Sequence, residues 1–230
     1  MKNQNPEIFS QTLKIFSSTY ISEDNEEIHR QYISIKKTLN SNPSFQLQSV
    51  LNKEFCLYEE ECKVIETQTS FLFKDDWNTV SNKDDILIQT NKTPQQFLIK
   101  VQFSVIFDPL KIFSVLYESD FIEDWMKTIE SSRTLETTSI YRKKVQNFYN
   151  LPWPLNNRHS ILNVRYYPIS LLNTILITSY TPKENFENPV NKGKYIEMVL
   201  PSASSWIKFN ENNCTVVIIL QANKYIVCST

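Results

Sequence analysis

The chain has 230 residues, with 24 basic and 25 acidic side chains and a formal net charge of −1. This balance provides no long-range attraction for nucleic acid, so we expect no nucleic-acid partner. The chain contains one glycine, Gly193. Dinucleotide-binding fingerprints, phosphate-binding loops and the nucleophile elbow of hydrolases need several glycines at fixed offsets, so these sites are excluded.

The four cysteines, at positions 56, 62, 214 and 228, match no zinc-binding spacing. We therefore expect reduced thiols, no metal and no cofactor. The first ten residues are polar and lack the apolar segment of a signal peptide. We expect a cytoplasmic protein on this basis.

Apolar residues at helical spacing predict two short helices within residues 1–42. The segment 40–44, which contains Pro43, is the candidate boundary between this N-terminal helical extension and a domain over residues 43–230. A further amphipathic helix is predicted after Leu47, interrupted by polar residues around Asn52 and Glu54.

The clearest strand follows, because every odd position from Phe97 to Phe107 is apolar. It ends at Asp108 and Pro109, a pair that predicts the first turn of a helix. Asp120, with Glu123 three residues later, resembles a capping box and predicts a second short helix through Trp125 and Met126.

After Arg133 the pattern predicts successive strands separated by turn residues, at about 135–149, 160–167, 174–181, 194–200, 205–209 and 214–222. Consecutive strands without intervening helices pair antiparallel. The predicted fold class is α+β, in which helices open the domain, a helical pair interrupts the sheet and an antiparallel meander closes it.

The chain contains, in order, a strand, the segment DPLKIFSVLYESDFIEDWM, a second strand and the segment LPWPLNNRHSILNVRYYP. This order of segments resembles the steroidogenic acute regulatory protein-related lipid transfer (START) family. Trp125, the proline-rich turn at 152–154 and Arg158 match the family's tryptophan, turn and strand-opening arginine. The resemblance covers about residues 43–224. It implies a helix-grip fold, a curved antiparallel sheet around a C-terminal helix, with an apolar tunnel for one lipid or sterol.

Three departures from the family accompany this resemblance. His159 stands where the family has an acid, and Glu197 where it usually has an arginine. The chain ends at Thr230, which leaves no room for the C-terminal helix that covers the tunnel in the family. Either a protein partner or the N-terminal helices cover the tunnel, or the chain is a shortened relative, because soluble monomers rarely expose a large apolar surface.

The predicted function is non-catalytic binding of a lipid or sterol, as a carrier or sensor. The candidate lipid-binding residues are Phe103, Trp125, Arg158, Asn163, Arg165, Tyr167, Met198 and Trp206. For Asn163 and Arg165 an outward, solvated position is the favoured interpretation. For Trp125 and Trp206 ordinary packing is favoured over lipid contact. Arg158 is balanced between a structural role, such as the internal ion pair that the resemblance implies, and ligand orientation.

Two alternatives remain. The chain is an interaction or regulatory domain with a filled or open cavity, or an enzyme of the wider helix-grip superfamily, such as a cyclase or hydrolase. The enzyme would need a perturbed acid or base, for which His159, Glu197 and tyrosines are the candidates. The basic run from Arg142 to Lys144 is interpreted as solvated, with transient contact with a membrane surface as the other possibility.

Overall fold

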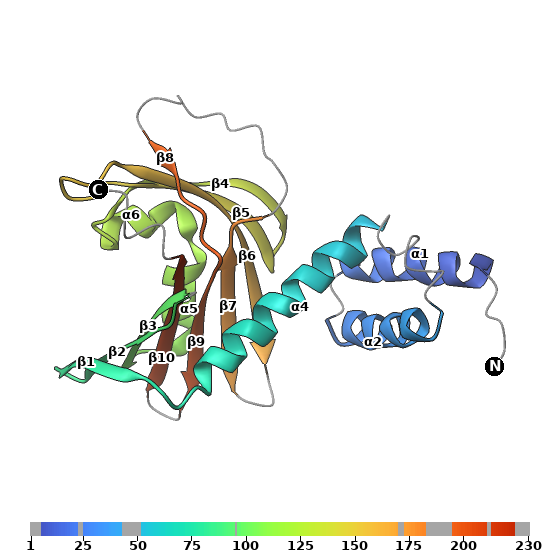
Figure 1. Cartoon of the computed structure of the whole chain (residues 1–230), viewed down its shortest axis with the longest axis horizontal. Helices are drawn as coiled ribbons and strands as arrows, with labels where there is room; N and C mark the ends of the chain where they lie inside the picture. The colour runs from blue at the N-terminus through green and yellow to red at the C-terminus, as the bar shows by residue number, and fades with distance from the viewer. Residues whose placement is uncertain are drawn as a thin grey trace. The chain divides into compact units, whose positions relative to one another are not determined.

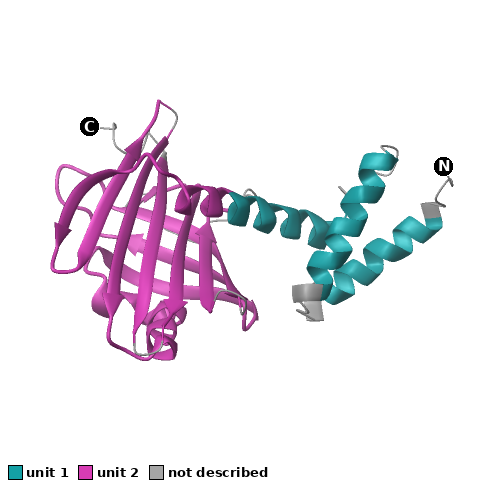
Figure 2. Cartoon of the chain, turned by 90° about the horizontal axis from the view of Figure 1, so that it is seen from below, with its two compact units in different colours: residues 1–66 teal, residues 67–230 magenta. Residues whose placement is uncertain are grey.

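The computed structural model describes residues 6–22, 25–42, 52–94, 96–169, 173–182, 195–210 and 213–223. The chain divides into two compact units, residues 1–66 and residues 67–230, which Figure 2 shows in different colours. The first unit is helical, and the second is built on a sheet.

The helical unit contains α1 (Pro6–Ser22), α2 (Asn25–Ser41) and most of α4 (Lys53–Leu72). The two helices predicted within residues 1–42 are confirmed. Phe16 is fully buried and meets Phe55 and Tyr58 edge-on, with ring centroids 5.5 and 5.8 Å apart. Because α4 supplies Phe55 and Tyr58 to this core, the structure divides the chain at residue 66, whereas the sequence placed the boundary after residue 42.

Asn52 precedes helix α4 and caps its first turn. Its side-chain Oδ1 accepts a hydrogen bond from the backbone N–H of Phe55 at 2.8 Å, which satisfies one of the free donors of the first turn. The helix is not interrupted at Glu54, since it runs from Lys53 to Leu72, and the part expected between Leu47 and Leu51 lies outside the described residues.

In the described part of the second unit, ten strands form one sheet. Nine of them follow the order β1-β2-β3-β10-β9-β7-β6-β5-β4 with antiparallel pairing, and β8 pairs parallel with β6. Their bounds are β1 Asn78–Lys83, β2 Ile86–Lys92, β3 Gln96–Val105, β4 Ile129–Ser139, β5 Arg142–Tyr149, β6 Arg158–Ile169, β7 Thr174–Tyr180, β8 Ile196–Glu197, β9 Ser202–Phe209 and β10 Cys214–Asn223.

The sheet is strongly curved, and the helices between β3 and β4 lie on its inner side (Figure 1). These are α5 (Pro109–Tyr117), a 3₁₀ turn (Ser119–Phe121) and α6 (Ile122–Trp125). The predicted α+β class, with a curved antiparallel sheet and an inserted helical pair, is confirmed.

Two strand predictions need correction. The single strand expected over 135–149 is a hairpin of β4 and β5, which turns at Ile140 and Tyr141. The strand expected over 194–200 is reduced to the two residues of β8. The hairpin was missed because its turn contains neither glycine nor proline.

The capping box expected at Asp120 and Glu123 is also wrong. Phe121 occupies the N-cap of α6, without a side-chain cap. The two carboxylates instead accept hydrogen bonds from backbone N–H groups of β4, Asp120 from Thr134 at 2.6 Å and Glu123 from Ser132 at 3.2 Å. The β4–β5 pairing is shifted near these positions, so β4 uses side-chain acceptors there. The helix start expected at Asp108 and Pro109 is confirmed.

Three residues other than glycine lie in the left-handed backbone region. Asp84 and Asp85 connect β1 to β2 with φ of 52° and 60°, and Asn173 precedes β7 with φ of 46°. Aspartate and asparagine tolerate this conformation better than other residues with a Cβ atom. These residues therefore form turns in a chain with one glycine.

Candidate functional site

The strand register assigns each side chain of the curved sheet to one of two faces. The inner face is the one against which α5 packs, and it carries Phe103 of β3, Ile207 of β9 and Val216 of β10. The outer face carries Leu98 and Ile219, which pack against Phe71 in the last turn of α4. The following description concerns the inner face.

Helix α5 fills one end of the inner face. Phe113 and Tyr117 of the helix lie 5.7 and 4.8 Å, between ring centroids, from the buried ring of Tyr166. The carbonyl oxygen of Tyr117, in the last turn, accepts hydrogen bonds from Tyr166 Oη at 3.4 Å and Lys143 Nζ at 3.1 Å. Burial raises the pKa of Tyr166, which keeps its hydroxyl protonated as a donor. This end is closed by packed side chains.

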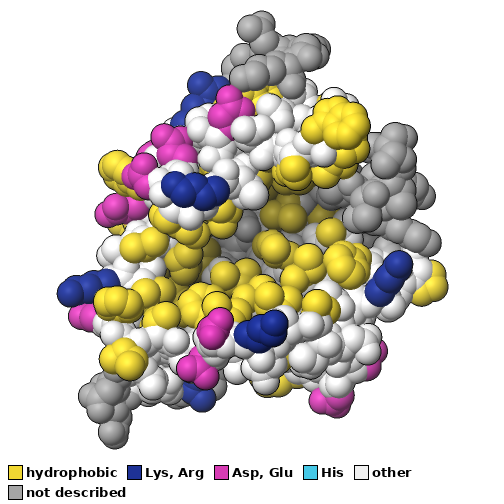
Figure 3. All heavy atoms as spheres, turned by 90° about the vertical axis from the view of Figure 1, so that its left-hand side faces the viewer, with side chains coloured by type: hydrophobic (Ala, Val, Ile, Leu, Met, Phe, Trp, Pro, Cys, Tyr) yellow, Lys and Arg dark blue, Asp and Glu magenta, His cyan; other side chains and the backbone are white. Residues whose placement is uncertain are grey.

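Beyond α5 the inner face carries small side chains at its centre. Ser179 of β7 and Ala203 of β9 are cross-strand partners, and Ser205 lies two residues further along β9. On the β3 and β10 side of this centre the apolar inner-face residues are not fully buried: Phe97, Ile99, Val101 and Ile218 are half-buried, and Leu220 is 38% exposed. Figure 3 shows an open hollow lined mainly by hydrophobic side chains. Small residues in the centre leave this space unfilled.

A polar network lies on the inner face of β4, β5 and β6, at the end away from α5. Ser132 Oγ donates to Asn147 Oδ1 at 2.7 Å, and Asn147 Nδ2 donates to Tyr149 Oη at 3.3 Å. Tyr149 Oη and Ser160 Oγ are hydrogen-bonded at 3.1 Å. Arg158 lies directly opposite Tyr149 and is buried. The site therefore combines an apolar hollow with hydroxyl, amide and guanidinium groups at one end.

Comparisons with known proteins bear on this arrangement. No family model and no curated protein matches the sequence. Among solved structures, human StAR-related lipid transfer protein 5 is similar with a TM-score of 0.64 and 8% identity, over 72% of this chain and 81% of that one. Human STARD10 gives a TM-score of 0.60 and 14% identity, over 69% and 65%. A STAR-related lipid transfer protein from Xanthomonas axonopodis gives 0.56 and 14%, over 64% and 82%.

The chain has a START-like fold. The resemblance seen in the order of sequence motifs is thus confirmed for the fold. The inner face of the START-like sheet is the candidate site, since it is the face with the hollow and the polar network.

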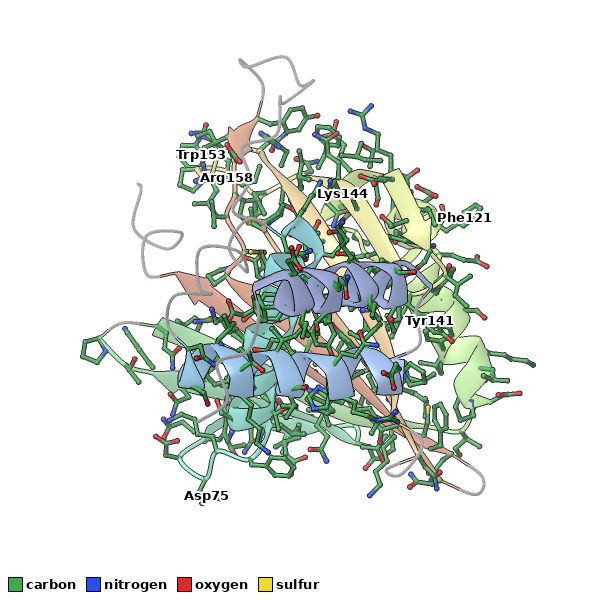
Figure 4. The ribbon with its side chains drawn as sticks, turned by 90° about the vertical axis from the view of Figure 1, so that its right-hand side faces the viewer. Asp75, Phe121, Tyr141, Lys144, Trp153 and Arg158 are labelled. Atoms are coloured by element: carbon green, nitrogen blue, oxygen red, sulfur yellow. The ribbon has the colours of Figure 1, made fainter. Side chains whose placement is uncertain are left out.

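The START-like sheet places the candidate lipid-binding residues predicted from the sequence on different faces. Phe103 and Arg158 lie on the inner face, and Arg158 opens β6 beside the loop that carries the exposed Trp153 (Figure 4). Trp125 ends α6 and is 41% exposed, and Met198 follows β8. The remaining four residues, Asn163, Arg165, Tyr167 and Trp206, lie on the outer face.

Arg165 is buried on the outer face, with 1% of its surface exposed. The solvated position expected for it is therefore wrong, although the expected outward direction is right. Its guanidinium carbon lies 5.0 Å from the ring centroid of Tyr167. Trp206 is also buried, and its Nε1 donates to Ser204 Oγ at 3.0 Å, which is ordinary packing with a satisfied donor.

Among the acid and base candidates, His159 and Glu197 lie on the outer face, whereas Tyr149 belongs to the polar network of the inner face. His159 is buried and has outer-face neighbours, Phe148 among them. Burial lowers the pKa of His159, and the nearby Glu197 opposes this only in part. Within the described residues, no group of three or more histidine, cysteine, aspartate or glutamate side chains is placed to hold a metal ion. Among the described helices, none is long and apolar enough to cross a membrane.

Sequence reasoning missed Ser132, Asn147, Tyr149 and Ser160. Their only sequence signal is that Asn147 and Tyr149 share the alternation of Val145, an inner-face residue. Bringing the four together requires the pairing of β4 with β5 and of β5 with β6. That register depends on a hairpin which the sequence pattern merged into one strand.

Proposed function

We propose that the START-like unit binds one lipid in the hollow of its inner face and acts as a carrier or sensor, without chemistry on the lipid. The observation that supports this most is that the apolar inner-face residues of β3 and β10 beyond α5 stay partly exposed, beside the small side chains of Ser179, Ala203 and Ser205. Each methylene group that a lipid buries there gains about 0.8 kcal/mol. A dry, shaped surface is therefore sufficient for binding.

The chemistry of the inner face favours binding over catalysis. Its polar network consists of hydroxyl and amide groups that already hydrogen-bond to one another. The buried His159 lies on the outer face, on the other side of the sheet from the hollow. A general base must come within hydrogen-bond reach of the proton that it removes, which this position does not provide for a ligand in the hollow.

A protein partner that covers the hollow is the second candidate, because the exposed Leu220 and the half-buried Ile99 are also what an interface would bury. Under this candidate the unit is an interaction or regulatory domain. Such a partner and a bound lipid would compete for the same apolar side chains, so lipid capture separates the two functions.

The test is the lipid content of the full chain, purified from cells and then incubated with phosphatidylcholine vesicles that contain cholesterol. Native mass spectrometry should show one lipid per chain. Ser205→Phe places a large ring at the centre of the inner face and should reduce bound lipid about tenfold. Gln102→Phe, at an exposed outer-face position, is the matched control and should bind as the natural chain does. Absence of lipid from the natural chain would refute the proposal.

A further inference from the structure

The hydrogen bonds of the polar network on the inner face run in one direction. Asn147 Oδ1 can only accept, so Ser132 donates to it at 2.7 Å. Asn147 Nδ2 can only donate, so Tyr149 Oη is the acceptor of the 3.3 Å bond between them. One lone pair of the Tyr149 hydroxyl is therefore occupied by Asn147 of the same strand, β5.

The bond between Tyr149 and Ser160 also has a preferred direction. Ser160 is fully buried, whereas Tyr149 is half-buried. In the described part of the chain, Tyr149 Oη is the hydrogen-bond partner of the Ser160 hydroxyl. If Tyr149 donated, the proton of Ser160 would be buried without an acceptor, which is unfavourable. Ser160 therefore donates, and Tyr149 accepts a second time.

The Tyr149 hydroxyl is consequently a donor with no remaining acceptor capacity. Asn147 and Ser160 use both of its lone pairs, and its own proton remains for a group outside the network. Accepting two hydrogen bonds polarises the O–H bond and strengthens it as a donor. Arg158, directly opposite Tyr149 in the register, has a guanidinium group that also can only donate.

A ligand alcohol and a ligand carbonyl differ in how they hydrogen-bond to the Tyr149 hydroxyl, which can only donate. A carbonyl oxygen only accepts, so the Tyr149 proton satisfies it. An alcohol also brings its own proton, for which Tyr149 and Arg158 offer no acceptor, so it needs a second partner such as the half-buried Ser132 hydroxyl of β4 or else binds more weakly. Ser179 does not replace them, since it lies opposite Val164, two inner-face positions beyond Ser160 along β6.

We propose that the Tyr149 hydroxyl is the polar anchor of the lipid site and selects acyl lipids, through a carbonyl oxygen, over lipid alcohols such as sterols and over ether lipids. This inference rests on the proposed function and specifies its ligand class. Ser160 and Asn147 are positioning residues, because they hold the hydroxyl and direct its proton.

The test offers the full chain vesicles with equimolar amounts of a diacyl phosphatidylcholine, its dialkyl ether analogue with the same chain lengths, and cholesterol. The protein is then repurified and its bound lipid is counted by native mass spectrometry. The two phosphatidylcholines share headgroup and chains and differ in the carbonyl groups. We expect the diacyl form to be enriched about fivefold or more over each competitor, the effect of one hydrogen bond in a dry site.

Substitutions assign the preference to Tyr149. Tyr149→Phe should bring the ratio of diacyl to ether lipid close to one, and Ser160→Ala should give an intermediate ratio. Tyr167→Phe, on the outer face of the neighbouring strand, is the matched control and should keep the preference. If Tyr149→Phe fails to fold by circular dichroism, the natural chain and Ser160→Ala decide the test.

The outcomes separate this inference from the function on which it rests. Equal uptake of diacyl and ether lipid, a preference for cholesterol, or an unchanged preference in Tyr149→Phe would each overturn the anchor and leave lipid binding intact. A natural chain that takes up none of the three lipids would refute both proposals.

Discussion

Replacing Gln68 with leucine should strongly destabilise the START-like unit. Gln68 is fully buried in the last turns of α4, and its amide bonds to two serines of β9. Its Nε2 donates to Ser202 Oγ at 2.6 Å, and its Oε1 accepts from Ser204 Oγ at 2.7 Å. Ser202 in turn donates to Gln221 Oε1 on β10 at 2.8 Å. One side chain thus connects the helix to two strands.

The magnitude follows from these contacts. Leucine has a similar size, so the change removes hydrogen bonds without leaving a large cavity. Two lost hydrogen bonds weaken the fold by about 1 kcal/mol each, and the buried Ser204 hydroxyl left without its acceptor adds about 1 to 3 kcal/mol. The expected loss in the free energy of unfolding is about 3 to 5 kcal/mol, a large part of the stability of an ordinary domain.

Unfolding in guanidinium chloride, followed by tryptophan emission, measures this loss. All four tryptophans, at positions 77, 125, 153 and 206, belong to the second unit, so the signal reports on that unit. Gln102→Leu, exposed on the same outer face, is the control and should change stability by less than about 0.5 kcal/mol. The double variant Gln68→Leu with Ser202→Ala should lose less than the sum of the two single losses. A loss below about 1 kcal/mol for Gln68→Leu, or strict additivity, would refute the reasoning.

Three further predictions concern other parts of the chain. Burial raises the pKa of the Cys62 thiol to about 12, so iodoacetamide at pH 8 should alkylate Cys62 in the folded chain much more slowly than the exposed Cys56, and equal rates would contradict this. Asp120→Ala removes the acceptor of the Thr134 amide and should speed hydrogen exchange there by about tenfold while changing global stability by about 1 kcal/mol; unchanged exchange would show that β4 does not depend on this bond. Burial lowers the pKa of His159 below its unfolded value, so protonation favours the unfolded chain, and stability should fall as the pH drops through about 6.5. His159→Gln should flatten that part of the pH profile of the unfolding midpoint, and an unaltered profile would exclude His159 as its source.

The sequence was sufficient for those elements whose signals are local. The alternation from Phe97 onward matches β3, and the Asp108 and Pro109 pair marks the start of α5. Both signals follow from backbone geometry, which neighbouring residues determine. The order of these elements was also sufficient to indicate the START-like fold.

The failures have tertiary causes. Asp120 and Glu123 have the spacing of a capping box, but the shifted pairing of β4 offers them backbone donors outside their own helix. Arg165 has the period of a solvated residue and is nevertheless buried. Tyr149 and Ser160 become neighbours only through the β5–β6 register. Single-sequence periodicity contains no information on which strands pair or on what covers each face.

The turn residues Asp84, Asp85 and Asn173 show how hairpins can be made almost without glycine. A residue with a Cβ atom is sterically strained in the left-handed region, but it also restricts the conformations of the denatured chain and so loses less entropy on folding. Glycine has no such strain but loses more conformational entropy on folding. Since each effect amounts to about 1 kcal/mol, the two nearly cancel. A chain poor in glycine can therefore connect the strands of such a sheet with little loss in the free energy of unfolding.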